Sequence, residues 1–282
     1  MSDALTVALA GGPYGLTAGP DRRVWVTLVH SGEIARVGAD GVVDIFPVAP
    51  DAKPSNIVAG PDGALWFTRA GDGRIGRVTV DGEFSEYELG EGSMPFGITN
   101  GPDGCLWFTD MTSGTVGRIT TDGEISVEQA VGGMPSMIVT GPDRAVWFTL
   151  NQGNAIGRLD LDGELTVRKL PTPSAGPVGI ATTHDDAVWF TEILAEKLGR
   201  IPLDEAMQEL DMPGKPHAVV ADPAGGVWVS LWGSDQLARV DADGETVTFD
   251  LPSGSEPHGM AIGPDGALWV ALESGFVLRL PT

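Results

Sequence analysis

The sequence has one cysteine, few basic residues and no long apolar run, and each shortage excludes a class of protein. Cys105 cannot form an internal disulfide, so the 282-residue chain is not a disulfide-stapled domain. The 17 Lys and Arg residues stand against 39 Asp and Glu residues, and the resulting net charge of −22 repels phosphate backbones and anionic lipid surfaces. We therefore expect no nucleic-acid partner and no membrane partner.

Signals for membrane insertion and for helices are also missing. No stretch approaches the roughly 18 consecutive apolar residues of a membrane-spanning helix, and residues 1–10 lack the cationic start and apolar run of a signal peptide. Helical periodicity is absent over any useful length. With 42% hydrophobic residues, the chain can still bury a large core. We expect a cytoplasmic all-β protein.

Tryptophan marks a repeat of about 40 residues. Seven of the eight tryptophans are separated by 41, 41, 40, 42, 39 and 41 residues, namely Trp25, Trp66, Trp107, Trp147, Trp189, Trp228 and Trp269. Around each of them, short runs of β-branched and aromatic residues are bounded by Gly, Pro and Asp, which is typical of strands joined by tight turns. Four short strands in each of seven units predict a seven-bladed β-propeller of four-stranded antiparallel blades, as a single domain over residues 1–282.

The two ends of the chain predict how the ring closes. The last unit stops after its third strand, at residues 276–281, and residues 5–9 resemble an unpartnered fourth strand that precedes the first unit. We expect the N-terminal strand to pair into the last blade. The alternative, an open solenoid, would leave one end bare and require a polar cap that the sequence does not show.

Positions that differ between the units indicate function, because structural residues recur in every repeat. After the proline that leads into each first strand, the units read Tyr14, Ser55, Phe96, Ser136, Val178, His217 and His258. We predict that His217 and His258 reach one mouth of the channel from neighbouring blades. Histidine suits proton transfer near neutral pH. We interpret His30 and His184 as structural, because His184 lies in a turn and His30 has no acidic partner at a matched position.

The same mouth carries aromatic residues and methionines. These either pack against the blades or form an apolar bed for a bulky ligand. They are Tyr14, Phe96, Met94, Met111, Met134, Met137 and Trp232.

The seventh unit alone adds an acid at each of two further positions of this mouth. If residues 263–266 form a four-residue hairpin loop, Glu256 lies opposite Glu273, and His258 lies opposite Ala271. Directly opposed carboxylates are destabilising unless a cation lies between them or one is protonated. Two carboxylates without a thiolate favour Mg²⁺ over Zn²⁺. We predict that Glu256 and Glu273 hold Mg²⁺ beside the base His258; the alternative is a pair of solvated loop acids.

The units resemble those of the virginiamycin B lyase family over nearly the whole chain. The most specific matches are residues 215–218 (Lys-Pro-His-Ala), 255–259 (Ser-Glu-Pro-His-Gly) and 268–273 (Leu-Trp-Val-Ala-Leu-Glu). The resemblance implies that Glu256 and Glu273 bind Mg²⁺, that His258 is the general base, and that His217 binds substrate. The family phrase Trp-Phe-Thr-Glu keeps its acid only at Glu192, which we interpret as a change in the rim.

The resemblance also implies a reaction. Family members linearise cyclic streptogramin B depsipeptides, small-molecule antibiotics, by elimination at the threonyl ester rather than by hydrolysis, and so confer antibiotic resistance. No nucleophilic serine or cysteine is needed, and none stands at these positions. We expect a monomer.

Two other functions are alternatives to this lyase. A metal-dependent lactonase or esterase of the gluconolactonase or paraoxonase kind would add water to its substrate, whereas a lyase product is an isomer of the substrate. A non-catalytic propeller that binds a peptide or protein at the channel mouth would be insensitive to a divalent chelator.

Overall fold

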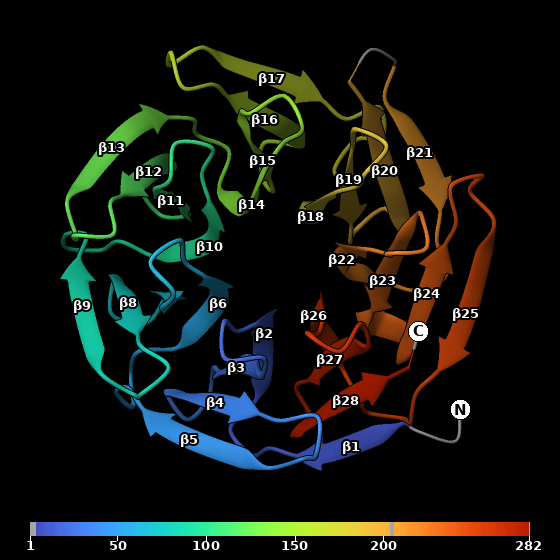
Figure 1. Cartoon of the computed structure of the whole chain (residues 1–282). Helices are drawn as coiled ribbons and strands as arrows, with labels where there is room; N and C mark the ends of the chain where they lie inside the picture. The colour runs from blue at the N-terminus through green and yellow to red at the C-terminus, as the bar shows by residue number, and fades with distance from the viewer. Residues whose placement is uncertain (1–3, 204–205, 282) are drawn as a thin grey trace.

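The strands of the computed structural model, which describes residues 4–203 and 206–281, close into a ring of seven sheets around a central channel (Figure 1). The predicted seven-bladed propeller is confirmed: each sheet in this part of the chain has four antiparallel strands. Residues 1–3 and 282, the ends of the predicted 1–282 domain, lie outside the described residues.

In blades 1 to 6 the four strands follow one another along the chain, from the channel to the outer edge (Figure 1). Blades 1 to 3 consist of β2 (Pro13–Ala18), β3 (Val24–Leu28), β4 (Glu33–Val37), β5 (Val43–Pro47), β6 (Pro54–Ala59), β7 (Leu65–Arg69), β8 (Arg74–Val78), β9 (Phe84–Glu88), β10 (Pro95–Asn100), β11 (Leu106–Asp110), β12 (Thr115–Ile119) and β13 (Ile125–Ala130). Blades 4 to 6 consist of β14 (Pro135–Thr140), β15 (Val146–Leu150), β16 (Ala155–Leu159), β17 (Leu165–Lys169), β18 (Pro177–Thr182), β19 (Ala187–Glu192), β20 (Lys197–Pro202), β21 (Gln208–Asp211), β22 (Pro216–Ala221), β23 (Val227–Leu231), β24 (Gln236–Val240) and β25 (Thr246–Asp250). A short 3₁₀ turn, η1 (Trp232–Ser234), follows β23.

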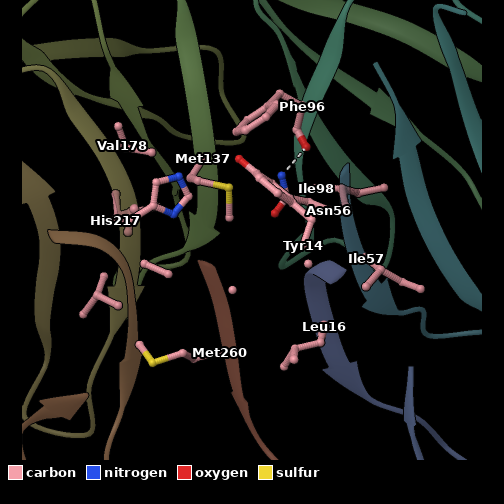
Figure 2. A pocket seen from close by; sticks show the side chains of 16 residues that line it. Tyr14, Leu16, Asn56, Ile57, Phe96, Ile98, Met137, Val178, His217 and Met260 are labelled. Carbon is pink, nitrogen blue, oxygen red and sulfur yellow. Dashed lines mark hydrogen bonds between the residues drawn. The ribbon is translucent and has the colours of Figure 1, made fainter. Parts of the chain in front are cut away.

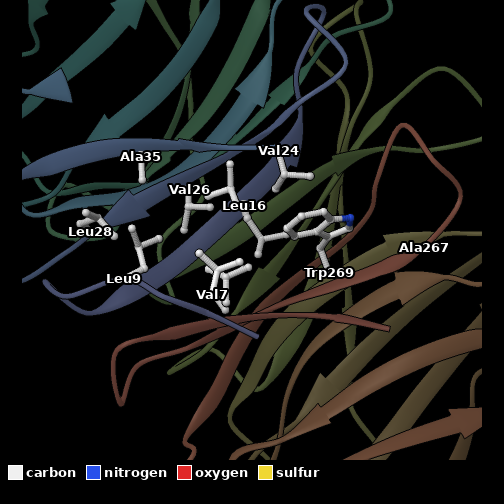
Figure 3. Packing of buried hydrophobic residues seen from close by; sticks show 12 residues of the cluster. Val7, Leu9, Leu16, Val24, Val26, Leu28, Ala35, Ala267 and Trp269 are labelled. Carbon is white, nitrogen blue, oxygen red and sulfur yellow. The ribbon is translucent and has the colours of Figure 1, made fainter. Parts of the chain in front are cut away.

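Blade 7 combines both ends of the chain. It consists of β26 (Pro257–Ile262), β27 (Leu268–Leu272), β28 (Phe276–Leu280) and, as its outer strand, β1 (Leu5–Ala8). Antiparallel pairing runs from Leu5 opposite Arg279 to Ala8 opposite Phe276. Val7 and Leu9 pack into a buried cluster shared by blades 1 and 7, near Trp269 (Figure 3). The predicted closure is confirmed, and the solenoid alternative is wrong.

The repeated tryptophans pack between neighbouring blades. Trp66 of blade 2, for example, contacts a cluster that includes Ile98 and Phe108 of blade 3. The indole nitrogen also needs a partner when buried, and in blades 1 to 4 and in blade 7 the Asp of the preceding turn supplies one. Trp147 Nε1 donates to Asp143 Oδ1 at 2.9 Å, and Arg158 Nε donates to Asp143 Oδ2 at 2.6 Å. The recurrent turn and Ile-Gly-Arg phrases therefore cap the recurrent tryptophan.

The threonine two residues after most of these tryptophans ties one blade to the next. Thr149 Oγ1 donates to the carbonyl of Val178 at 2.8 Å, and Thr191 Oγ1 donates to the carbonyl of His217 at 2.8 Å. Each acceptor belongs to the residue after the proline of the following first strand. The Phe-Thr phrase therefore fixes the residues that vary between the units.

Each first strand carries a β-bulge directly after its proline. In blade 7, Pro257 pairs with Leu272 but Met260 pairs with Val270, so His258 and Gly259 form the bulge. Bulges re-aim side chains and are common beside functional sites.

The bulge corrects the predicted register of blade 7. Ile262 pairs with Leu268 rather than with Ala267, so the hairpin loop is one residue longer than predicted. The bulge absorbs this difference, and the Glu273 N–H donates to the Glu256 carbonyl at 3.1 Å. The backbones of the two acids are therefore opposite each other as predicted, whereas His258 lies in the bulge and not opposite Ala271.

In residues 4–203 and 206–281, helices of a length and hydropathy that could cross a membrane are absent.

Candidate active site

The bulged residues of blades 6, 7 and 1 converge at one mouth of the channel. The ring centroids of His217 and His258 are 4.5 Å apart, and the ring of Tyr14 lies 4.6 Å from that of His258 and 6.0 Å from that of His217. The prediction that the two imidazoles meet from neighbouring blades is confirmed. Gly259 permits this closeness, because a Cβ atom there would lie 2.4 Å from the carbonyl oxygen of Tyr14.

A cavity of about 110 Å³ lies in the channel beside these rings and is lined by residues of the first strands (Figure 2). His217, Tyr14 and Phe96 surround it together with aliphatic side chains such as Leu16 and Ile57 (Figure 2). Of the predicted apolar bed, Tyr14, Phe96 and Met137 line this cavity, whereas Met94, Met111, Met134 and Trp232 do not. Trp232 instead places its ring 6.4 Å from that of His258.

His258 is buried, with 7% of its surface exposed. The residue lies within β26, and its ring is packed 4.6 Å from the ring of Tyr14 and 4.5 Å from that of His217. Burial, together with a smaller effect of the neighbouring His30, lowers the pKa of His258 to about 4. The imidazole is therefore neutral at pH 7, which a general base requires.

Both ring nitrogens of His258 are shielded from solvent. Nε2 lies against Oε2 of Glu273 as an ion-pair contact, but neither Nε2 nor Nδ1 has a hydrogen-bond partner of good geometry among the described residues. A carboxylate beside one imidazole nitrogen favours the tautomer with its proton there. The lone pair is then at Nδ1.

His217 is a second neutral imidazole. Burial, and to a smaller extent His258, lowers its pKa to about 3 against the opposing effect of Glu273. Its Nδ1 is buried without a partner among the described residues, so it is available to a ligand. Its backbone is fixed by the hydrogen bond from Thr191.

Tyr14 is a further polar group of the site. Burial raises the pKa of its phenol, and Glu273 raises it further, so the group stays protonated and can donate a hydrogen bond. Its position in the repeat was the available signal, because one of only two tyrosines in the chain occupies the position that holds histidine in blades 6 and 7.

Glu273 contacts two histidines, His258 and His30. Its Oε1 lies 2.8 Å from Nε2 of His30, and its Oε2 contacts His258. The interpretation of His30 as lacking an acidic partner is therefore wrong. Glu273 of blade 7 does not occupy the matched position of the repeat, and the closure of the ring brings it next to His30 of blade 1.

Glu256 lies beside this group in a left-handed backbone conformation, with φ of 50°, and is exposed. Its N–H donates to Oδ1 of Asp235 at 2.9 Å, and its carbonyl accepts from the Glu273 N–H. Within the described part of the chain, no group of three or more His, Cys, Asp or Glu side chains could hold a metal. Mg²⁺ needs fewer protein ligands, because it takes one or two carboxylates and keeps several waters. The pair Glu256 and Glu273 fits that requirement, and the Mg²⁺ site stays a prediction.

The positions of the Trp-Phe-Thr-Glu phrase are interior, which corrects their interpretation as rim residues. The fourth residue of the phrase is buried in each of blades 1 to 6, at Leu28, Arg69, Asp110, Leu150, Glu192 and Leu231. Their side chains do not form the surface that a ligand first meets.

Comparison with known proteins places the chain in one family. Residues 3–280 match the model of the virginiamycin B lyase family. A virginiamycin B lyase of Mycolicibacterium smegmatis is 74% identical over 281 residues, covering 100% of both chains. One from Mycobacterium sp. strain KMS is 72% identical, covering 97% of this chain and 98% of the relative.

Solved structures agree. The crystal structure of virginiamycin B lyase from Staphylococcus aureus is 37% identical with a TM-score of 0.94, covering 99% of both chains. A catalytically inactive histidine-to-alanine variant of the S. aureus enzyme, solved with quinupristin, has a TM-score of 0.93 at 36% identity and covers 99% of both chains. The chain therefore belongs to the virginiamycin B lyase family and is a carbon–oxygen lyase.

Proposed function

We propose that this protein opens the ring of streptogramin B depsipeptides of the virginiamycin B type by elimination at the threonyl ester, with Mg²⁺ as its cofactor. The observation that carries the proposal is the neutral, buried imidazole of His258, which lies between Tyr14, His217 and Glu273 at the channel mouth. The names of the M. smegmatis and S. aureus relatives support the same reaction. The inactive histidine variant of the S. aureus enzyme supports a catalytic histidine.

His258 acts as the general base in this proposal. Its Nδ1 takes the threonyl α-proton, the electron pair of the broken C–H bond forms the new carbon–carbon double bond, and the carbon–oxygen bond of the ester breaks. The released carboxylate leaves with the bonding electrons, and a dehydrobutyrine end remains. Glu273 contacts Nε2 and stabilises the imidazolium that forms, because an adjacent carboxylate favours the protonated imidazole.

His217 and Tyr14 bind and orient the substrate in the same proposal. Both lie beside His258, and each carries a polar group that can bond a depsipeptide: the unpartnered Nδ1 of His217 and the protonated phenol of Tyr14. The apolar side chains of the cavity, such as Leu16 and Ile57, can pack against apolar parts of the depsipeptide.

Glu256 and Glu273 would hold Mg²⁺, which withdraws electrons from the ester carbonyl when bound. We propose that the protein acts as a monomer.

The test is incubation of the pure protein with quinupristin, with and without EDTA, followed by mass spectrometry. The proposal predicts a ring-opened product of the same mass as the substrate and loss of turnover in EDTA that Mg²⁺ restores. A product heavier by one water would identify a lactonase instead. Binding without turnover would identify a non-catalytic scaffold. A gene that raises the streptogramin B concentration tolerated by a susceptible host would support a role in resistance.

A further inference from the structure

We propose that His30 is a positioning residue for this reaction: its Nε2–H holds one carboxylate oxygen of Glu273 so that the other oxygen faces His258. The inference rests on the proposed function, because Glu273 acts there on His258. His30 does not touch the reacting atoms in this proposal, and it acts through Glu273.

The contact of Glu273 with two imidazoles is the first observation. His30 Nε2 lies 2.8 Å from Oε1, and His258 Nε2 lies against Oε2. The side chain of His30 is 62% exposed, that of Glu273 is 24% exposed, and that of His258 is 8% exposed. A carboxylate with one oxygen held by a hydrogen bond has less freedom to rotate away from its other neighbour. The exposed imidazole therefore restrains the carboxylate that contacts the buried one.

The space that the His30 ring occupies beside Gly12 is the second observation. A Cβ atom on Gly12 would lie 2.2 Å from Cδ2 of His30, so only glycine leaves room for this ring. Gly12 has a φ of 72°, but Lys53, Met134 and Glu256 adopt φ of 45°, 56° and 50° at the matching positions of other blades. The backbone conformation therefore tolerates a side chain, and the space for His30 is what requires glycine here.

The repeat gives the third observation. Five residues after the tryptophan, the other blades carry no histidine but Gly71, Thr112, Gln152, Leu194, Gly233 and Ser274. The backbone N–H of His30 also donates to the carbonyl of Gly11 at 2.9 Å, which holds the His30 backbone beside Gly12. His30 and Gly12, the glycine that leaves space for its ring, therefore occur together in blade 1. The closure of the ring places this blade next to Glu273.

A purely structural ion pair would behave differently. Exposed pairs contribute little to stability, about 0–1 kcal/mol. If His30 were a surface residue without a role in positioning Glu273, its replacement would change neither stability nor turnover. If it positions Glu273, its loss lowers kcat while stability and KM stay near their wild-type values.

The test compares His30→Ala, His30→Gln and the control His184→Ala, an exposed histidine in a distant turn. The glutamine amide keeps an N–H donor near the position of Nε2. For His30→Ala we expect a loss of about 10–100-fold in kcat at nearly unchanged KM, and a similar loss in Mn²⁺ affinity measured by electron paramagnetic resonance. His30→Gln should recover most of both, and His184→Ala should match the wild type.

Wild-type kcat and Mn²⁺ affinity in His30→Ala would overturn the inference, and so would a His30→Gln variant no better than His30→Ala. Failure of the proposed function is a separate result, because the wild-type protein itself would then not open quinupristin. In that case the crystal structure of His30→Ala decides: the inference predicts that Glu273 loses its contact with His258, and an unmoved carboxylate refutes it.

Discussion

Replacing Thr191 with valine distinguishes the effect of this residue on catalysis from its effect on the stability of the fold. The Thr191 hydroxyl donates to the His217 carbonyl at 2.8 Å and accepts from the Gly179 N–H at 2.8 Å. Each such hydrogen bond contributes about 0.5–1.5 kcal/mol net, so losing both costs about 1–3 kcal/mol. The side chain is fully buried, and water cannot replace these bonds. Urea unfolding should therefore show a lower midpoint at an unchanged slope.

Thr149→Val is the matched control. Thr149 is equally buried, donates to the Val178 carbonyl at 2.8 Å and accepts from the Met137 N–H at 3.1 Å. Both variants should lose similar stability. Only Thr191→Val should lose much turnover, up to about 100-fold, because a misplaced binding group is costly and His217, unlike Val178, carries a polar group that binds the substrate. Equal losses of kcat/KM in the two variants would refute the assigned role of Thr191 and His217.

Three further predictions concern the blades and the metal. The pKa values of Asp62, Asp103, Asp143, Asp185 and Asp265 lie below their ordinary value of 3.8, because hydrogen bonds, mainly from Trp, Arg or backbone N–H groups, outweigh the opposing effect of burial. Carboxylates of this kind stabilise the fold above their unfolded pKa, and this stability is lost as the pH falls through their folded pKa values. Thermal unfolding measured from pH 6 to pH 2 should therefore show a melting temperature that begins to fall near pH 4. A constant melting temperature would contradict the prediction. Gly259→Ala should cost about 1–3 kcal/mol and lower turnover, since its Cβ atom would overlap the Tyr14 carbonyl, as urea unfolding and kinetics can measure. Glu273→Gln should weaken Mg²⁺ binding at least tenfold in calorimetry, and an unchanged affinity would remove Glu273 from the metal site.

The repeat made the fold predictable. Seven evenly spaced tryptophans define seven units, and the missing fourth strand of the last unit defines the closure. The meeting of His217 and His258 was predictable for the same reason, because equivalent positions of neighbouring blades lie side by side around a ring.

The details that a repeat does not encode escaped prediction. A β-bulge leaves no clear mark in a short strand, so the displacement of His258 from the position opposite Ala271 was missed. The contact between His30 and Glu273 was missed because it joins unmatched positions across the closure of the ring. Sequence alone also does not fix side-chain direction, which is why Glu273 was expected to face only another acid.

Elimination by His258 is tested most directly by carrying out ring opening in water labelled with heavy oxygen and measuring the mass of the product by mass spectrometry. Elimination with His258 as the base breaks the carbon–oxygen bond without water, so the product of the wild-type protein should carry no heavy oxygen and should keep the mass of the substrate, while His258→Ala should give no product. A product with one heavy oxygen, or full turnover by His258→Ala, would contradict the proposed elimination.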